Sequence, residues 1–134
     1  METVKQIEYN GALYDIQDAE AQKNLVYSQE ETDTGKIWID GKKIYRKVVN
    51  CGTLLNSAKK EVKHNIENID EICFQYGKTY LLSQKIFLPL PYVYDSTGTI
   101  ALSATKEVIN LTTFGNRTEA INTSVVLEYT KTTN

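Results

Sequence analysis

The chain has 134 residues, with 17 acidic and 15 basic side chains and a net charge of −2. This length fits one domain, which can bury roughly two-thirds of its unfolded surface. The nearly neutral charge balance provides no basic field, so we expect no nucleic-acid partner.

Hydrophobic patterning excludes a membrane-inserted protein. No window approaches the roughly 18 apolar residues that a membrane span needs, and the N-terminus lacks the apolar stretch of a signal peptide. The chain begins with Met1, and we expect a complete product made inside the cell. Nine tyrosines stand out in the composition, and tyrosine suits both strands and binding surfaces.

Cysteine and histidine are too few for a zinc site. A structural zinc needs about four nitrogen or sulfur ligands, and the chain has only Cys51, Cys73 and His64. We therefore predict no metal site and no cofactor. The two cysteines lie far apart in the sequence, and buried free thiols are favoured over a disulfide.

The first 27 residues predict a hairpin followed by a short helix. Residues 4–9 and 12–16 flank an Asn-Gly dipeptide, which favours a tight hairpin turn. Residues 17–25 then favour a helix, with Asp15 or Asp18 able to cap its exposed amides. So short a helix is marginal alone in water. It packs either on its own domain or against copies of itself, and both alternatives stay open.

Residues 28–35 are polar and acidic, and we interpret them as a linker. Strands are then expected in quick succession, beginning with a hairpin around Asp40-Gly41. In the segment 71–76, the alternation predicts that Ile72, Phe74 and Tyr76 point inward. Further strands are expected at 42–51, 60–64, 99–104, 107–113 and 121–130, the last with Ile121, Val125, Leu127 and Tyr129 on one face.

These elements predict a mainly β protein. We expect an antiparallel β-sandwich of about seven to eight strands, preceded by the small N-terminal hairpin and the short helix.

The apolar segment 86–94 contains two prolines. Pro89 and Pro91 lack amide donors, which excludes a central strand and predicts an edge or crossover segment. An apolar edge must be covered by the same chain or by another copy, and we favour self-association. The residues assigned to an oligomer interface are Ile16, Ala19, Leu25, Phe87, Leu88 and Leu90.

Tyrosines beside the turn at 95–98 suggest ligand contacts. Aromatic faces pack on sugar rings, and a carboxylate accepts hydrogen bonds from sugar hydroxyls. The ligand-binding residues that we predict are Tyr80, Tyr92, Tyr94 and Asp95. The recognition loop could be any of the segments 78–85, 94–99 or 114–120.

No catalytic residue is predicted. A nucleophile and base pair would need His64 with a serine or a cysteine, and no nucleophile-elbow pattern is present. We interpret His64 as a strand-end residue hydrogen-bonded to a neighbouring loop. The carboxylates Glu67, Asp70 and Glu71 cluster, but a charged loop between strands explains them.

A series of short runs covers nearly all of residues 27–131. The runs are Trp38-Ile-Asp-Gly-Lys-Lys-Ile-Tyr-Arg-Lys47, Gly52-Thr-Leu54, Val62-Lys-His-Asn-Ile66, Asn68-Ile-Asp70, Leu88-Pro-Leu-Pro-Tyr-Val93 and Val126-Leu-Glu-Tyr-Thr-Lys131. In order and spacing they resemble the C-terminal head modules of bacteriophage fibre proteins. The segment from Tyr9 to Gln22 is similar to one often found near joints in phage tail proteins.

The resemblance implies a β-sandwich that forms a homotrimer on a virion, commonly faces the host surface and has no catalytic activity. The chain departs from the family at Asn65, where the family tends to have glycine. Asparagine tolerates a left-handed backbone, so we expect the turn to survive. The chain also lacks the long shaft of many fibres, which leaves its mounting on tail or capsid open.

Together these observations assign residues 1–27 to attachment and trimer organisation, 28–35 to a linker and 36–134 to a head domain. The expected place of action is the virion, after synthesis in the cytoplasm of the bacterial host. The expected partners are copies of itself, other virion structural proteins and a host-surface glycan. Two alternatives remain: a capsid fibre or decoration protein without a receptor role, and a monomeric carbohydrate-binding module.

Overall fold

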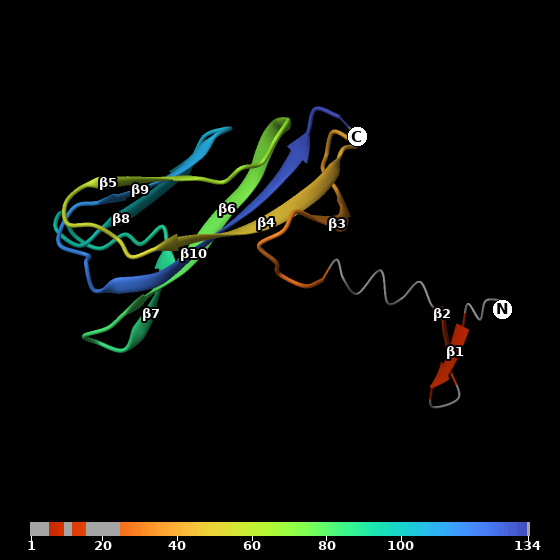
Figure 1. Cartoon of the computed structure of the whole chain (residues 1–134), viewed down its shortest axis with the longest axis horizontal. Coiled ribbons are helices and arrows are strands. Elements are labelled where there is room, and N and C mark those ends of the chain that lie inside the picture. Colours follow the sequence, from red (N-terminus) through yellow and green to blue (C-terminus); the bar gives the residue numbers. More distant parts are fainter. Residues whose placement is uncertain (1–5, 10–11, 16–24, 134) are drawn as a thin grey trace.

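The computed structural model describes residues 6–9, 12–15 and 25–133, and the regular elements in this part of the chain are strands (Figure 1). Their bounds are β1 (Gln6–Tyr9), β2 (Ala12–Asp15), β3 (Thr32–Ile37), β4 (Lys43–Gly52), β5 (Lys59–Lys63), β6 (Ile69–Leu81), β7 (Ile86–Leu90), β8 (Ile100–Ala104), β9 (Val108–Thr113) and β10 (Ala120–Lys131).

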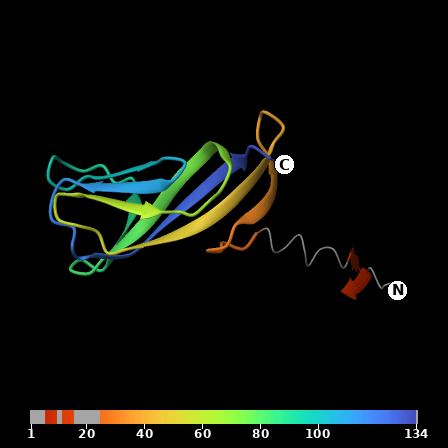
Figure 2. The same ribbon diagram turned by 45° about the horizontal axis from the view of Figure 1, so that its top comes forward.

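The strands from β3 onward form two antiparallel sheets in a sandwich-like arrangement. One sheet has five strands in the order β3-β4-β10-β6-β7, and the other has three in the order β5-β9-β8. Figure 2 shows the smaller sheet facing one side of the larger. The predicted mainly β sandwich is therefore confirmed. The predicted N-terminal hairpin is also present, as the pair β1-β2.

The expected helix at 17–25 lies outside the described residues, except for Leu25, which belongs to a turn. Ile16 and Ala19, two of the residues assigned to an oligomer interface, also lie outside them.

The core lies between the two sheets, with β10 at its centre. Val125, Leu127 and Tyr129 alternate along β10 and are fully buried. The small sheet contributes Ile109 and Leu111, which are equally buried. Apolar side chains from both inner faces therefore interdigitate, as expected for packed sheets.

A bulge changes the face of the first residues of β10. Asn122 has a φ of 52°, and the pairing with β6 shifts between Ile121 and Ser124. Because an extra residue reverses the alternation, Ala120 and Thr123 are buried, and Ile121 is only half-buried. The prediction that Ile121 shares the face of Val125 is therefore wrong.

A second irregularity corrects the predicted inner face of β6. Ile72 packs against the core, but Phe74 is 50% exposed and Tyr76 is 37% exposed. The pairing with β10 skips Cys73, because Glu128 lies opposite Phe74 and Tyr129 lies opposite Ile72. Phe74 and Tyr76 therefore lie on the outer face of the sheet.

The segment predicted as a linker contains most of strand β3. Thr32 and Ile37 pair with Arg46 and Lys43 of β4, and the carbonyl of Ser28 accepts a hydrogen bond from the amide of Val48 (2.8 Å). Polar composition misleads here because an edge strand can carry polar side chains on both faces. The hairpin predicted at Asp40-Gly41 is present, with Gly41 at a φ of 89°.

Strand β7, which contains Pro89, is an edge strand, as the prolines of the segment 86–94 predicted. Side chains along β7 point alternately to the core and to the outside, so the residues assigned to an oligomer interface lie on both faces of this strand. Leu88 and Leu90 are buried in the chain's own core, which corrects their assignment, whereas Phe87 is 66% exposed. Period-two geometry explains the split, because neighbouring side chains point to opposite faces.

His64 has the structural role that the sequence predicts. It is buried, and its Nδ1 accepts a hydrogen bond from the amide of Ile66 (3.1 Å). Its Nε2 lies 3.0 Å from the carbonyl oxygen of Thr105, so this nitrogen carries the proton and donates. Asn65 follows at a φ of 57°, which confirms that asparagine supports the left-handed turn.

Both cysteines are free thiols. Burial raises the pKa of Cys51 to about 11. At Cys73, which is half-buried, partial burial is the larger cause of a pKa of about 11, with Glu71 adding to it.

Leu111→Ala is expected to lower the free energy of unfolding by about 2–5 kcal/mol, because it opens a cavity in a fully buried site. Urea unfolding followed by circular dichroism measures this change. Leu82→Ala is the matched control, since Leu82 is 48% exposed and its loss should cost less than about 0.5 kcal/mol. Equal losses in both variants would contradict the assigned core.

Candidate functional site

Three loops meet around a cavity at one end of the sandwich. The β6–β7 turn, the β7–β8 loop and the β9–β10 loop enclose about 420 Å³. Figures 1 and 2 show these loops at the end of the molecule away from β3 and the C-terminus. The lining residues are Leu81, Gln84, Leu88, Tyr92, Tyr94, Asp95, Thr97, Gly98, Asn116 and Arg117.

Two stacked tyrosines form the aromatic part of this cavity. The rings of Tyr92 and Tyr94 lie 6.1 Å apart with an interplanar angle of 15°. The backbone of Tyr92 pairs with Ile100 through hydrogen bonds of 3.0 and 2.8 Å, which fixes the loop to strand β8. Tyr94 is largely exposed, so the aromatic surface is anchored at one ring and accessible at the other.

Arg117 connects the β9–β10 loop to the tyrosines. Its guanidinium carbon lies 5.6 Å from the centre of the Tyr92 ring, close enough for a cation–π contact. Its Nη2 donates a hydrogen bond to the carbonyl of Gly98. One cationic side chain therefore braces two loops and adds a positive charge to the cavity.

Asp95 organises the turn beside the tyrosines. Its Oδ1 accepts hydrogen bonds from the amide (2.9 Å) and the hydroxyl (3.0 Å) of Thr97. These two bonds lower the pKa of the Asp95 carboxyl below its ordinary value of 3.8, because they stabilise the charged form. Asp95 is therefore ionised at neutral pH.

Two glycines allow close packing beside the cavity. A Cβ at Gly115 would lie 1.8 Å from the carbonyl oxygen of Thr97, and one at Gly98 would lie 2.7 Å from Cδ2 of Tyr94. Gly115 belongs to the β9–β10 loop and Thr97 to the β7–β8 loop, so the absence of a side chain at Gly115 allows direct backbone contact between the two loops, whereas Gly98 makes room for the Tyr94 ring within its own loop. The geometry of the cavity is thus set in advance of binding.

The arrangement suits a small polar ligand with apolar faces. Ligand sites combine an apolar or aromatic wall with a few placed polar groups. The tyrosine rings offer the wall, and Gln84, Asn116 and Arg117 offer amide and guanidinium donors. Sugars fit this description, because their ring faces carry C–H groups and their edges carry hydroxyls.

The structure brings together most of the residues predicted to bind a ligand. Tyr92, Tyr94 and Asp95 all line the cavity, but Tyr80 does not. Tyr80 lies on β6 with its ring centre 4.9 Å from that of Phe87, because strand alternation places it on the outer face of the sheet.

Sequence reasoning missed Gln84, Asn116 and Arg117 as lining residues. The sequence offers the segments 78–85, 94–99 and 114–120 as alternative recognition loops. No signal in the sequence indicated that all three line one cavity, since the pairing of distant strands brings them together.

Two of the three carboxylates that cluster in the sequence, Asp70 and Glu71, have structural partners, and the third, Glu67, is exposed. Asp70 contacts the ammonium of Lys42 at 2.6 Å, and Glu71 accepts a hydrogen bond from Nε1 of Trp38 (3.1 Å). They hold the β3–β4 hairpin against the start of β6. Across the residues with described side chains, no three His, Cys, Asp or Glu residues gather where they could hold a metal ion. The described residues also contain no helix able to cross a membrane.

No family model, curated protein or solved structure matches this chain. The function proposed below is therefore argued from the geometry of the site and from the resemblance of the sequence to bacteriophage fibre heads.

The lowered pKa of Asp95 predicts an acid-sensitive turn. A group whose pKa is lower in the folded than in the unfolded chain stabilises the fold above its unfolded pKa, near 3.9, and this stabilisation is lost as pH falls through the folded pKa. Amide NMR shifts of Thr97 and Gly98 should therefore titrate with a midpoint below about 3.9. Asp95→Asn should abolish that titration. A midpoint above about 4 in the unaltered protein would contradict the hydrogen-bonded turn.

Proposed function

We propose that this chain is the head module of a bacteriophage fibre, a homotrimer on the virion that attaches to the surface of the bacterial host. The series of short runs that resembles fibre heads supports this function, and the β-sandwich is the fold that the resemblance implies. The observation that carries the proposal is the cavity at the loop end, which presents the Tyr92–Tyr94 stack away from β3 and the C-terminus.

The ligand in this proposal is a glycan of the host surface. Tyr94 supplies an accessible ring, and Gln84, Asn116 and Arg117 supply donors for hydroxyl groups. A single shallow site of this kind binds weakly. A trimer presents three such sites on one particle, and linked sites can raise avidity about 10²–10⁴-fold without new contacts.

In this proposal the protein works on the virion, where it assembles with other structural proteins after synthesis in the host cytoplasm. It acts by binding, without catalysis, cofactor or nucleic-acid partner. A capsid fibre or decoration protein without a receptor role is the alternative in which virions lacking the chain adsorb normally.

A second candidate is a monomeric carbohydrate-binding module. The specific observation in its favour is that the stacked rings of Tyr92 and Tyr94 and the Arg117 side chain form the cavity from loops of a single chain. The two candidates differ in oligomeric state and share the same ligand chemistry.

Tyr94→Ala should weaken binding to an array of bacterial surface polysaccharides by about tenfold, since an aromatic stacking contact contributes up to about 1.5 kcal/mol. Tyr92→Ala should weaken it at least as much. Phe114→Ala is the matched control, because Phe114 is an exposed aromatic residue of the β9–β10 loop that does not line the cavity. Equal binding by all three variants and the unaltered protein would contradict the glycan site.

The proposal also predicts the mass of the isolated protein assembly in solution. Native mass spectrometry and light scattering at micromolar concentration should give about three times the chain mass of 15.2 kDa. A monomer that still binds polysaccharide would instead support the carbohydrate-binding module.

A further inference from the structure

Two of the oxygen acceptors that line the cavity at the loop end are already used within the chain. Oδ1 of Asp95 accepts hydrogen bonds from the amide and the hydroxyl of Thr97. Oδ1 of Asn116 accepts them from the amide (3.1 Å) and the hydroxyl (2.8 Å) of Thr118. Each of these oxygens has two lone pairs, so both are occupied before a ligand enters.

The donors on the Arg117 side of the cavity are still available. Because the amide of Thr118 can only donate, it fixes the oxygen of Asn116 and leaves the NH₂ group of that side chain for a ligand. Arg117 presents a planar fork of five N–H groups, of which Nη2 donates to the carbonyl of Gly98. This side of the cavity therefore suits a ligand group that accepts hydrogen bonds.

The positive charge of Arg117 has no ion-pair partner within the described part of the chain. The guanidinium contacts the carbonyl of Gly98 and the ring of Tyr92, and neither group carries a formal charge. Nε of Arg117 is also buried without a hydrogen-bond partner in this part of the chain. Hydrogen bonds between a cation and an anion are stronger than neutral ones, so an anionic group is the ligand feature that this side chain favours.

Asp95 supplies the carboxylate among the described lining residues, and its charge is stabilised by another group. The hydrogen bonds from Thr97 lower the pKa of the Asp95 carboxyl, so its negative charge is held within the turn at 95–98. Like charges repel, so this carboxylate opposes an anion beside the turn and directs it toward Arg117.

We propose that the glycan bound in this cavity is acidic, with a sugar carboxylate or phosphate on the guanidinium of Arg117 and the amide of Asn116, and with the sugar ring on Tyr94. The fork of an arginine side chain matches both anions through paired hydrogen bonds. A neutral sugar would leave the cation unpaired, so charge becomes the basis of selection. The inference rests on the proposed binding of a host glycan and names the class of glycan.

An array of acidic and neutral bacterial surface polysaccharides, probed with the full chain, tests the charge. The polysaccharides that bind should be acidic. Reduction of their carboxylates to alcohols, or removal of their phosphates with hydrofluoric acid, should weaken binding at least tenfold. Loss after the first treatment identifies a uronate as the anion, and loss after the second identifies a phosphate. Unchanged binding after both treatments contradicts the inference.

Two substitutions of opposite charge effect test the place of the anion. Arg117→Gln should weaken binding of the acidic polysaccharide at least tenfold, and Asp95→Asn should strengthen it, since the first removes an attraction and the second a repulsion. Damage to the loops would weaken binding in both variants, so opposite signs identify charge as the cause. Circular dichroism melting checks that both variants are folded. Unchanged binding in Arg117→Gln, or weaker binding in Asp95→Asn, contradicts the inference.

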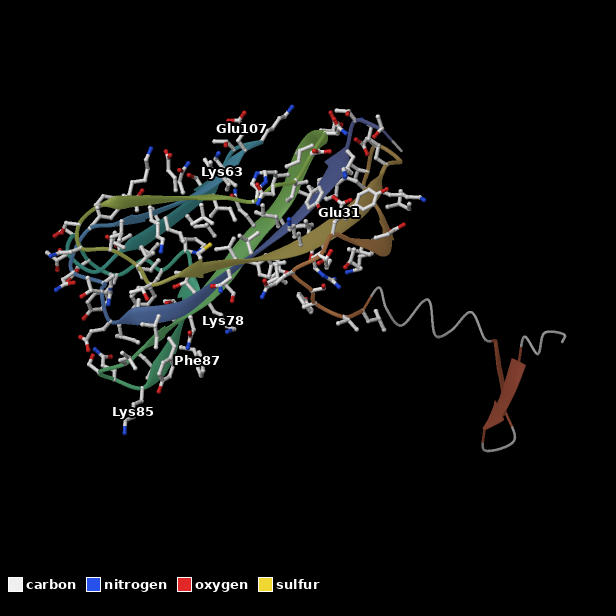
Figure 3. The ribbon with its side chains drawn as sticks, in the orientation of Figure 1. Glu31, Lys63, Lys78, Lys85, Phe87 and Glu107 are labelled. Atoms are coloured by element: carbon white, nitrogen blue, oxygen red, sulfur yellow. The ribbon has the colours of Figure 1, made fainter. Side chains whose placement is uncertain are left out.

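Lys85→Gln is the matched control. Figure 3 shows Lys85 at the tip of the β6–β7 hairpin, with its side chain directed away from the sandwich, and Lys85 does not line the cavity. Its substitution removes the same charge as Arg117→Gln and should change binding less than twofold. An equal loss in the two variants would indicate a general effect of net charge and contradict the assigned contact.

The outcomes separate this inference from the proposed function. Binding of neutral polysaccharides that Arg117→Gln leaves unchanged contradicts the acidic ligand, and the fibre head that binds a host glycan still stands. A protein that binds no polysaccharide on the array contradicts both.

Discussion

The position of β10 between β4 and β6 is the constraint on which the rest of the structure depends. This strand is the last in the sequence and the central one of the large sheet. Its inward residues, Val125, Leu127 and Tyr129, fill the space against the small sheet, and the hydroxyl of Tyr129 binds Glu31 before β3 (2.7 Å). The C-terminal strand therefore ties the first strand of the sandwich to its core.

The candidate site is a consequence of this topology. Because β6, β7, β9 and β10 are fixed by the core, the loops joining them must end at the same edge of the sandwich. Gly115 then allows the β9–β10 loop to touch the backbone of the β7–β8 loop at Thr97. A rigid scaffold that positions variable loops is a common basis for recognition, and here it supports the proposed binding of a glycan by a fibre head.

Apolar residues in this protein have different roles on the two sides of the same strand. Leu88 stabilises the core, whereas Phe87 beside it points outward. The same division separates Leu127 from Val126 on β10. This division explains how a chain of ordinary composition can fold around its own core and still carry apolar side chains such as Phe87 on its outer face.

The sequence by itself determined the class of fold, the hairpin at Asp40-Gly41, the edge position of the Pro89 segment and the left-handed turn at Asn65, because turn chemistry and proline geometry act locally. Only the tertiary structure decided the faces of Phe74, Tyr76 and Ile121, since a bulge of one residue reverses alternation without a clear signal in composition. The tertiary structure also decided that Asn116 and Arg117 join Tyr92 and Tyr94. Such a meeting follows from strand pairing between distant segments, and local pattern carries no information about which distant strands will pair.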